Sequence, residues 1–159
     1  MTDRVENRGG AAVGFMSDLN SVEAATVDCL RRWSDGPEAQ ADLWNDMSLA
    51  MGTQNARRAV QSFDQLYGLC ARFGRRKLMR HSVTCACLGA DEACFANFIG
   101  AAADGQREDA MMIATLLVRA DYASIVTTLA TDFGMALRRM PCPVGHSALT
   151  DAKTTTTLH

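Results

Sequence analysis

Apolar residues recur every three or four positions along most of the chain, which is the spacing of one face of an α-helix. Glycine and proline interrupt this pattern at Gly36-Pro37, Gly52, Gly74, Gly105 and Pro141. The segments between these breaks predict helices over residues 21–35, 37–51, 53–73, 90–103, 106–120 and 121–140. No stretch alternates between apolar and polar residues for more than about five positions, so no strand is expected.

We therefore expect an all-α fold, a single-domain helical bundle or orthogonal array of about six helices. The helical domain is predicted over residues 17–146, between a flexible N-terminal arm at residues 1–16 and a flexible C-terminal tail at residues 147–159. Residues 75–89 are expected to form a loop. Many helix-packing positions are alanine, which buries little area, so a homodimer that buries more surface is a further expectation.

The length of 159 residues and the 48% hydrophobic content suit one globular domain that buries its own core. The longest strongly apolar run, Met111–Val118, is far shorter than the ~20 residues of a membrane span. Charged residues stand where a secretory signal would be apolar. We therefore expect a cytoplasmic protein with no membrane partner, in which the six cysteines are thiols or metal ligands. Richness in Ala, Arg, Asp and Gly is typical of GC-rich bacterial coding.

Positive charge is concentrated in the middle of a chain whose formal net charge is only −2. Residues 53–81 contain seven basic residues and one acidic residue. The candidate partner-binding patch consists of Arg72, Arg75, Arg76, Lys77 and Arg80. It could bind an acidic partner, or it could be a solvated loop that pairs with the protein's own acids, among them Asp91 and Glu92. The pI near 5.9 and the lone interleaved aromatic, Phe73, argue against a dedicated nucleic-acid binder.

The six cysteines fall into two groups. Cys29, Cys70 and Cys94 lie on predicted apolar helix faces, where a free cysteine packs as a small hydrophobic residue. The others, Cys85, Cys87 and Cys142, lie in predicted loops.

The loop cysteines have histidines near them in the sequence. His81 precedes Cys85 by four residues, and His146 follows Cys142 by four. The candidate metal ligands are therefore His81, Cys85, Cys87, Cys142 and His146, a set of thiolates and imidazoles that suits zinc. A thiol beside Arg80 and His81 could instead have a lowered pKa and be readily oxidised. The third alternative is that these are structural cysteines without chemistry, because the paired C-x-x-C motifs of a typical zinc site are absent.

The sequence contains none of the phosphate-binding, nucleophile-elbow or metalloprotease motifs that we sought. No catalytic residue is therefore assigned, and the absence of these motifs favours a protein that is not an enzyme. No cofactor is expected, except that zinc is a candidate ligand of the cysteine segment. The leading prediction is a small cytosolic regulator or adaptor that acts through contact with a protein partner or a second copy of itself. Seven methionines could either fill the core or provide adaptable apolar surface for such contact: Met47, Met51, Met79, Met111, Met112, Met135 and Met140. Met111 and Met112 are adjacent and so point in different directions, and one of them is expected near a border or a partner. The alternative is a cysteine-based zinc-binding or redox-sensing protein.

Overall fold

The first helix begins at a cap that its own sequence encodes. In the computed structural model, which describes residues 7–140, α2 spans Ser21–Ser34. The Asn20 side chain accepts a hydrogen bond from the Glu23 backbone N–H at 2.9 Å, and the Glu23 carboxylate accepts one from the Asn20 N–H at 3.1 Å. This reciprocal capping box satisfies two amide donors that have no partner inside the helix.

Glycines with positive φ separate the next helices. α3 spans Pro37–Met51 and follows Gly36, whose φ is 116°. Gly52, with φ of 84°, joins α3 to α4, which spans Thr53–Phe73. Both angles lie where residues with a Cβ are strained, and Pro37 has the fixed φ that suits a first helical turn.

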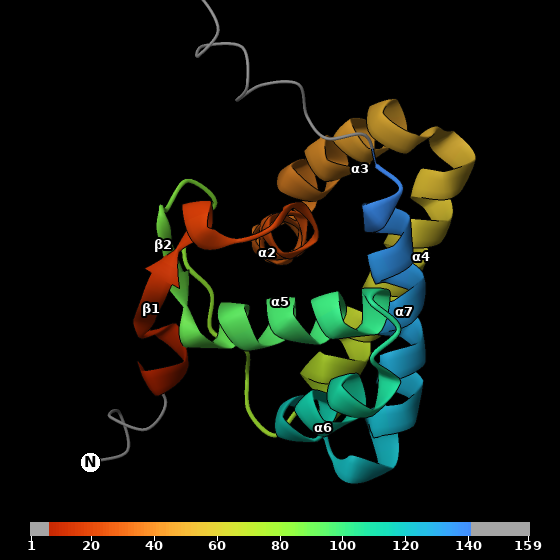
Figure 1. Ribbon diagram of the computed structural model, residues 1–159. Coiled ribbons are helices and arrows are strands. Elements are labelled where there is room, and N and C mark those ends of the chain that lie inside the picture. The colour runs from red at the N-terminus through yellow and green to blue at the C-terminus, as the bar shows by residue number, and fades with distance from the viewer. Residues whose placement is uncertain (1–6, 141–159) are drawn as a thin grey trace, which may run out of the picture.

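The C-terminal half of the described chain contains three further helices. α5 spans Ala90–Ala103, α6 spans Arg107–Leu117 and α7 spans Ala123–Arg138. A short 3-10 turn, η3 (Ala120–Tyr122), precedes α7. α5 is central, with α2, α6 and α7 packed around it (Figure 1). Its apolar residues surround the helix instead of forming one stripe, as a helix buried on several sides requires.

The prediction of an all-α, single-domain array of about six helices is confirmed. The helix bounds agree with the predicted ranges, except that the fifth and sixth helices are shorter than expected. No helix within residues 7–140 is long and apolar enough to cross a bilayer.

A small two-stranded sheet was not predicted. β1 (Ala12–Phe15) pairs antiparallel with β2 (Cys87–Gly89), and the 3-10 turns η1 (Asn7–Gly10) and η2 (Met16–Asp18) flank β1. Residues 7–16 of the predicted arm therefore lie against the helical domain. Strands of three and four residues are too short for an alternating pattern to be visible, and their pairing joins segments more than 70 residues apart. The predicted tail and residues 1–6 lie outside the described part of the chain.

Aromatic rings form the centre of the main core. The Phe63 ring of α4 lies 4.9 Å from the Phe133 ring of α7 and 6.4 Å from the Phe95 ring of α5, measured between centroids. Trp33 of α2 meets Phe63 edge-on at 5.8 Å. A second, smaller cluster of Val27, Leu88 and Ala96 lies beneath the two-stranded sheet. Four helices thus share one aromatic centre, and the sheet has an apolar base of its own.

The packing of α5 against α7 depends on a glycine. A Cβ at Gly134 would lie 2.9 Å from the Ala103 Cβ and 3.0 Å from the Ile99 carbonyl oxygen. We expect Gly134→Ala to lower the free energy of unfolding by about 1–3 kcal/mol, because overpacking outweighs the gain in helix propensity. Gly68→Ala on α4 is the matched control, since a Cβ there meets nothing within 4 Å. Gly68→Ala should raise the free energy of unfolding by about 0.5–1 kcal/mol, with both variants measured by urea titration. A Gly134→Ala variant that is more stable than the natural protein would contradict the close packing of α5 against α7.

Candidate functional site

A buried ion pair connects α2 to the first turn of α5. Arg31 Nε lies 2.7 Å from Glu92 Oε1, and Arg31 Nη2 lies 2.9 Å from Glu92 Oε2. The Arg31 side chain is 1% exposed and the Glu92 side chain is fully buried. Such bidentate geometry is the arrangement in which a guanidinium and a carboxylate interact most strongly.

The same two side chains hold the segment between α4 and α5 in place. Arg31 also donates to the carbonyl oxygens of Cys85 and Cys87, each at 2.7 Å. Glu92 accepts from the backbone N–H groups of His81 and Gly89, each at 2.9 Å. Four backbone groups of residues 81–89 thus bond to one buried ion pair, which fixes the conformation of the segment.

Burial and hydrogen bonding act in opposite directions on the pKa of Glu92. Burial of the carboxylate raises its pKa, but hydrogen bonds from Arg31, Gly89 and His81 outweigh burial, and the net pKa is lowered. The hydrogen bond to Glu92 raises the pKa of Arg31 against the opposing effect of burial. Both groups are therefore held in their charged forms.

The fixed segment brings a thiol and an imidazole together. His81 Nε2 lies 2.8 Å from the carbonyl oxygen of Gly10, and His81 Nδ1 lies 3.5 Å from Cys85 Sγ. A carbonyl oxygen can only accept, so Nε2 must be the protonated nitrogen of a neutral ring. Nδ1 is then free to accept the thiol proton, and the Cys85 side chain is partly exposed to solvent. The arrangement pairs an accessible thiol with an oriented base.

This pairing shifts the pKa values of both partners toward an ion pair. The hydrogen bond with His81 and further hydrogen bonds from Cys87 lower the pKa of Cys85. The hydrogen bonds with Cys85 and the Gly10 carbonyl raise the pKa of His81. The thiolate fraction of Cys85 at neutral pH is therefore larger than that of an unperturbed cysteine.

The other described cysteines differ in their surroundings. Burial raises the pKa of Cys70 to about 12, and it raises the pKa of Cys29 and Cys94 as well. Cys29 and Cys70 are buried in the main core, as the sequence predicted, whereas Cys94 is only partly buried. At neutral pH the thiolate fractions of Cys29, Cys70 and Cys94 are therefore smaller than that of Cys85, which makes these three cysteines a standard for comparison.

Three of the five candidate zinc ligands lie in this segment. His81, Cys85 and Cys87 are close together, but within residues 7–140 no group of three or more such side chains is arranged to hold a metal ion. Cys142 and His146 lie outside the described residues. Zinc binding by the full set stays a prediction.

The basic patch is only partly neutralised by internal contacts. Arg76 forms an ion pair with Asp91, which also accepts from the Met79 N–H at 2.7 Å. Arg75 donates to the Thr115 carbonyl and Arg80 to the Ser34 carbonyl, and neither forms an ion pair with an acidic residue in the described part of the chain.

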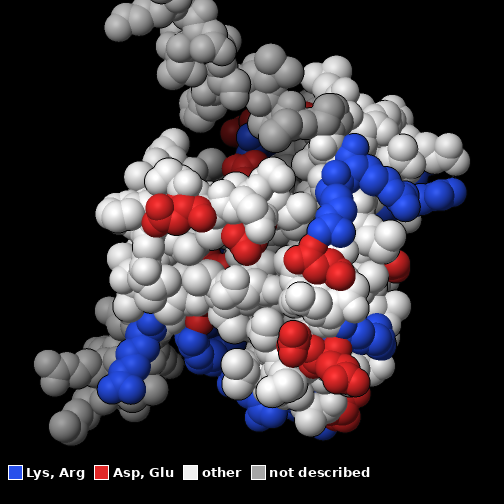
Figure 2. Space-filling view, viewed as in Figure 1, with Lys and Arg blue, Asp and Glu red and all other residues white. Residues whose placement is uncertain are grey.

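The remaining two cations of the patch are exposed. Arg72 lies over the Phe73 ring, and no described residue forms an ion pair with Arg72 or Lys77. Positive charge therefore persists along this segment. On the face shown in Figure 2, acidic and basic groups are otherwise interspersed among uncharged surface.

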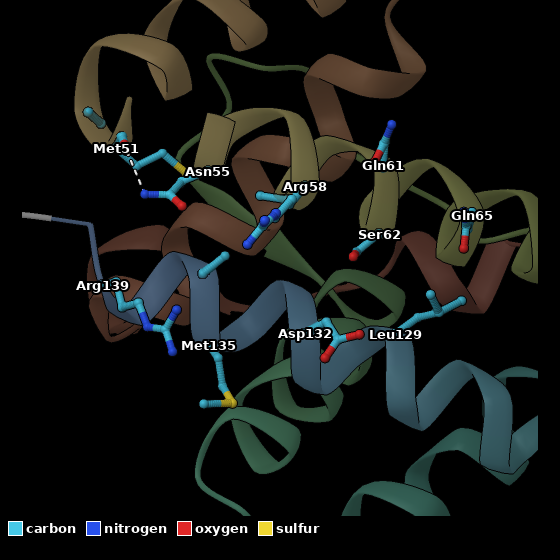
Figure 3. Close-up of a pocket in the computed structure, with 13 residues that line it drawn as sticks. Met51, Asn55, Arg58, Gln61, Ser62, Gln65, Leu129, Asp132, Met135 and Arg139 are labelled. Carbon is cyan, nitrogen blue, oxygen red and sulfur yellow. Dashed lines mark hydrogen bonds between the residues drawn. The ribbon is translucent and has the colours of Figure 1, made fainter. Parts of the chain in front are cut away.

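A wide cleft of about 740 Å³ lies between α4 and α7 (Figure 3). Arg58 extends into it from α4, and Asp132 and Arg139 line it from α7. Most of its polar lining is exposed to solvent, and Asp132 adds a negative charge to a lining that also contains two arginines. A ligand in this cleft would stay largely hydrated.

An apolar surface lies where β1 meets α5 and α6. Val13, Cys94, Ile113 and Leu116 line a shallow hollow there, and Val13 and Leu116 are 60% and 68% exposed. Met112 is 69% exposed, as expected of one of the two adjacent methionines of this helix. The surface is suited to protein contact.

Comparisons of this chain with protein-family models, with curated proteins and with solved structures find no match in any of the three. A functional assignment therefore depends on the residues of this chain. The thiol–imidazole pair is the arrangement that has a definite chemistry.

Sequence reasoning identified His81, Cys85 and Cys87 but missed the groups that position them. Glu92 was considered as a partner of the basic patch, but it caps α5 through the Gly89 N–H and its main partner is Arg31 of α2. Arg31 follows Val27 and Leu30 on the face of α2 that is buried, so a charge at that position was the available signal. The Gly10 carbonyl had no sequence signal, because any residue provides a backbone oxygen.

Removing the buried cation should be far more costly than removing its exposed neighbour. We expect Arg31→Met to lower the free energy of unfolding by about 3–5 kcal/mol, because Glu92 would be left buried without its counter-charge. Arg32→Met is the matched control, because Arg32 pairs with Asp46 and Asp28 at the surface. This substitution should lower the free energy of unfolding by less than about 1 kcal/mol. Equal losses for the two variants in chemical denaturation would contradict the buried pair.

Stability should also fall in acid because of Glu92. Its pKa in the folded protein lies below its value in the unfolded chain, so its stabilising effect is complete above the unfolded value of about 4.3. That effect is lost as the pH falls through the folded-state pKa. The difference in melting temperature between the natural protein and Glu92→Gln should therefore narrow as the pH falls from 7 to 3. A difference that stays constant over this range would contradict an ionised Glu92.

Proposed function

We propose that this protein is a thiol-based redox sensor in which Cys85 is the reactive residue and His81 is its base. The observation that supports this proposal is the hydrogen bond between Cys85 Sγ and His81 Nδ1, with His81 Nε2 oriented by the Gly10 carbonyl. Cys85 is partly exposed, so a small oxidant can reach it. A low-pKa, accessible cysteine with a second cysteine nearby has the features of a redox-sensing thiol.

The oxidant class is a hydroperoxide. His81 takes the thiol proton, and the Cys85 thiolate attacks one peroxide oxygen. An S–O bond forms, the O–O bond breaks, and the departing oxygen takes the proton from His81 as an alcohol or water. Cys85 is oxidised to a sulfenic acid and the peroxide is reduced.

Cys87 is positioned to complete the reaction. Its thiolate attacks the sulfenic sulfur, an S–S bond forms, the S–O bond breaks, and the hydroxyl group leaves as water with the Cys87 proton. Cys87 already hydrogen-bonds to Cys85 and is itself partly exposed. The two thiols together supply the two electrons that the peroxide accepts.

Oxidation would alter the segment's conformation as well as its chemistry. Cys87 is the first residue of β2, and residues two apart in an extended strand have Cα atoms about 6.7 Å apart, farther than the usual ~5.5–6 Å of a disulfide. We expect the disulfide to bend the chain around Ala86. Ala86 accepts a hydrogen bond from the Met16 N–H, and Cys87 pairs with Phe15, so bending would disturb the β1–β2 pairing. A surface strand would then report the oxidation state.

A regulator that acts through protein contact stays a prediction, and it is compatible with a thiol sensor. β1 presents Val13 and Phe15 to solvent, 60% and 58% exposed, beside the cysteine segment. A change in β1 pairing would alter that surface. Contact with a partner would then be the output of the sensor.

The reactivity of Cys85 provides the test. In the reduced full-length protein at pH 7, iodoacetamide should alkylate Cys85 at least about tenfold faster than Cys94, since each unit of pKa difference changes the thiolate fraction about tenfold. The midpoint of the pH–rate profile for Cys85 should lie below the ordinary thiol value of about 8.5 and rise in His81→Asn. Peptide mass spectrometry identifies the alkylated residue in each case.

Peroxide treatment tests the second step. One equivalent of hydrogen peroxide should yield a Cys85–Cys87 disulfide, whereas Cys87→Ser should retain a sulfenic acid that dimedone traps at Cys85. Cys94→Ser is the matched control and should behave as the natural protein does. Equal alkylation of Cys85 and Cys94, or a pH profile that His81→Asn leaves unchanged, would refute the proposal.

A further inference from the structure

A cavity of about 360 Å³ lies beneath the basic patch, apart from the thiol–imidazole pair. It is bounded by the end of α2, the last turns of α4 and residues 74–80. Its lining is mainly apolar and includes the side chains of Leu30, Cys70 and Leu78 and the ring of Tyr67. This volume falls in the range of small-molecule pockets.

The path of the chain after α4 creates the hollow. At Gly74 a Cβ would lie 2.1 Å from the Cys70 carbonyl oxygen, so only glycine allows the chain to turn this closely. The Arg75 N–H then bonds to the Leu117 carbonyl, and Arg76 pairs with Asp91 of α5. These two attachments hold residues 75–77 away from α4. The chain spans the gap between the helices, and the cavity lies beneath it.

Two cationic side chains in the lining, Lys77 and Arg80, have N–H groups without a hydrogen-bond partner among the described residues. Arg80 Nη2 donates to the Ser34 carbonyl at 2.8 Å, where it caps the end of α2, and its other N–H groups have no partner among the described residues. No described residue bonds to the ammonium of Lys77, which is exposed. Arg76 is not available, because Asp91 occupies its guanidinium group.

A neutral polar group lies inside the cavity wall. Ser34 Oγ lies 2.8 Å from the Leu30 carbonyl oxygen and 3.1 Å from Tyr67 Oη. The serine hydroxyl has one proton, which serves Leu30, so the Tyr67 hydroxyl donates to Ser34. The oxygen of Tyr67 can still accept a hydrogen bond.

We infer that this cavity binds a small amphiphilic anion, a carboxylate with an apolar tail, with the tail against Leu30, Cys70 and Leu78 and the carboxylate between Lys77 and Arg80. The apolar walls favour removal of the tail from water. The charged head stays at the rim, where it is partly hydrated and avoids the cost of burying a charge. The α4–α7 cleft has the acidic Asp132 in its lining, which disfavours an anion, and the hollow beside Val13 has no cation in its lining.

The probe is octanoate, titrated into the labelled full-length protein and followed by backbone amide NMR. Octanoate should change the amide chemical shifts of Leu30, Tyr67 and Leu78, and these changes should reach saturation. Octanol, which lacks the charge, and octyltrimethylammonium, which has the opposite charge, should each bind at least tenfold more weakly. Lys77→Gln should weaken octanoate binding at least threefold. Ala71→Trp, which places an indole at the exposed edge of the lining, should abolish it while circular dichroism confirms the fold.

Arg72→Gln is the matched control for charge, because Arg72 is exposed and nearby but does not line the cavity. It should bind octanoate within a factor of two of the natural protein. The inference is overturned if octanoate gives no saturable shifts, if octanol binds equally well, or if the shifts fall on another surface. It is also overturned if Arg72→Gln and Lys77→Gln weaken octanoate binding equally, because the patch would then recognise charge alone. The same conclusion follows if an acidic peptide, titrated in parallel, binds and octanoate does not.

Discussion

The ion pair between Arg31 and Glu92 is the interaction on which the conformation of the candidate site depends. Both side chains are withdrawn from water, which is costly for charges unless every polar atom finds a partner. They meet that requirement through each other and through four backbone groups of residues 81–89. The same bonds that make the buried charges tolerable also fix the segment that contains His81 and Cys85. The hydrogen bonds that compensate the buried charges are therefore the same bonds that position the Cys85 thiol.

The main core lies apart from the segment that contains the candidate site. The aromatic centre built around Phe63 joins four helices, whereas the sheet and the cysteine segment lie over a small separate cluster of Val27, Leu88 and Ala96. A rearrangement of that segment would expose little of the main core. In the proposed sensor, this division would let the Cys85 thiol and the short strand pairing change state while the helices stay packed.

The sequence predicted much of the fold and part of the candidate site. Helix number and most bounds followed from apolar spacing and from breaks such as Gly36 and Gly52, because these are local properties of the backbone. Cys85 and Cys87 were singled out because they lie off the helices, near a histidine. The strands, the role of Arg31 and the Gly10 carbonyl were missed, because each depends on a contact between distant segments.

The sequence by itself determined that this chain forms an array of helices, which glycines separate several of them, and that two loop cysteines stand near a histidine. Tertiary structure alone decided which nitrogen of His81 faces the thiol, that Arg31 is inside, and that the basic segment spans a cavity. The physical reason is the separation along the chain of the residues that interact. Helix formation depends on neighbours three and four residues away, whereas a pKa, a buried charge and a cavity depend on groups that only the folded chain brings together.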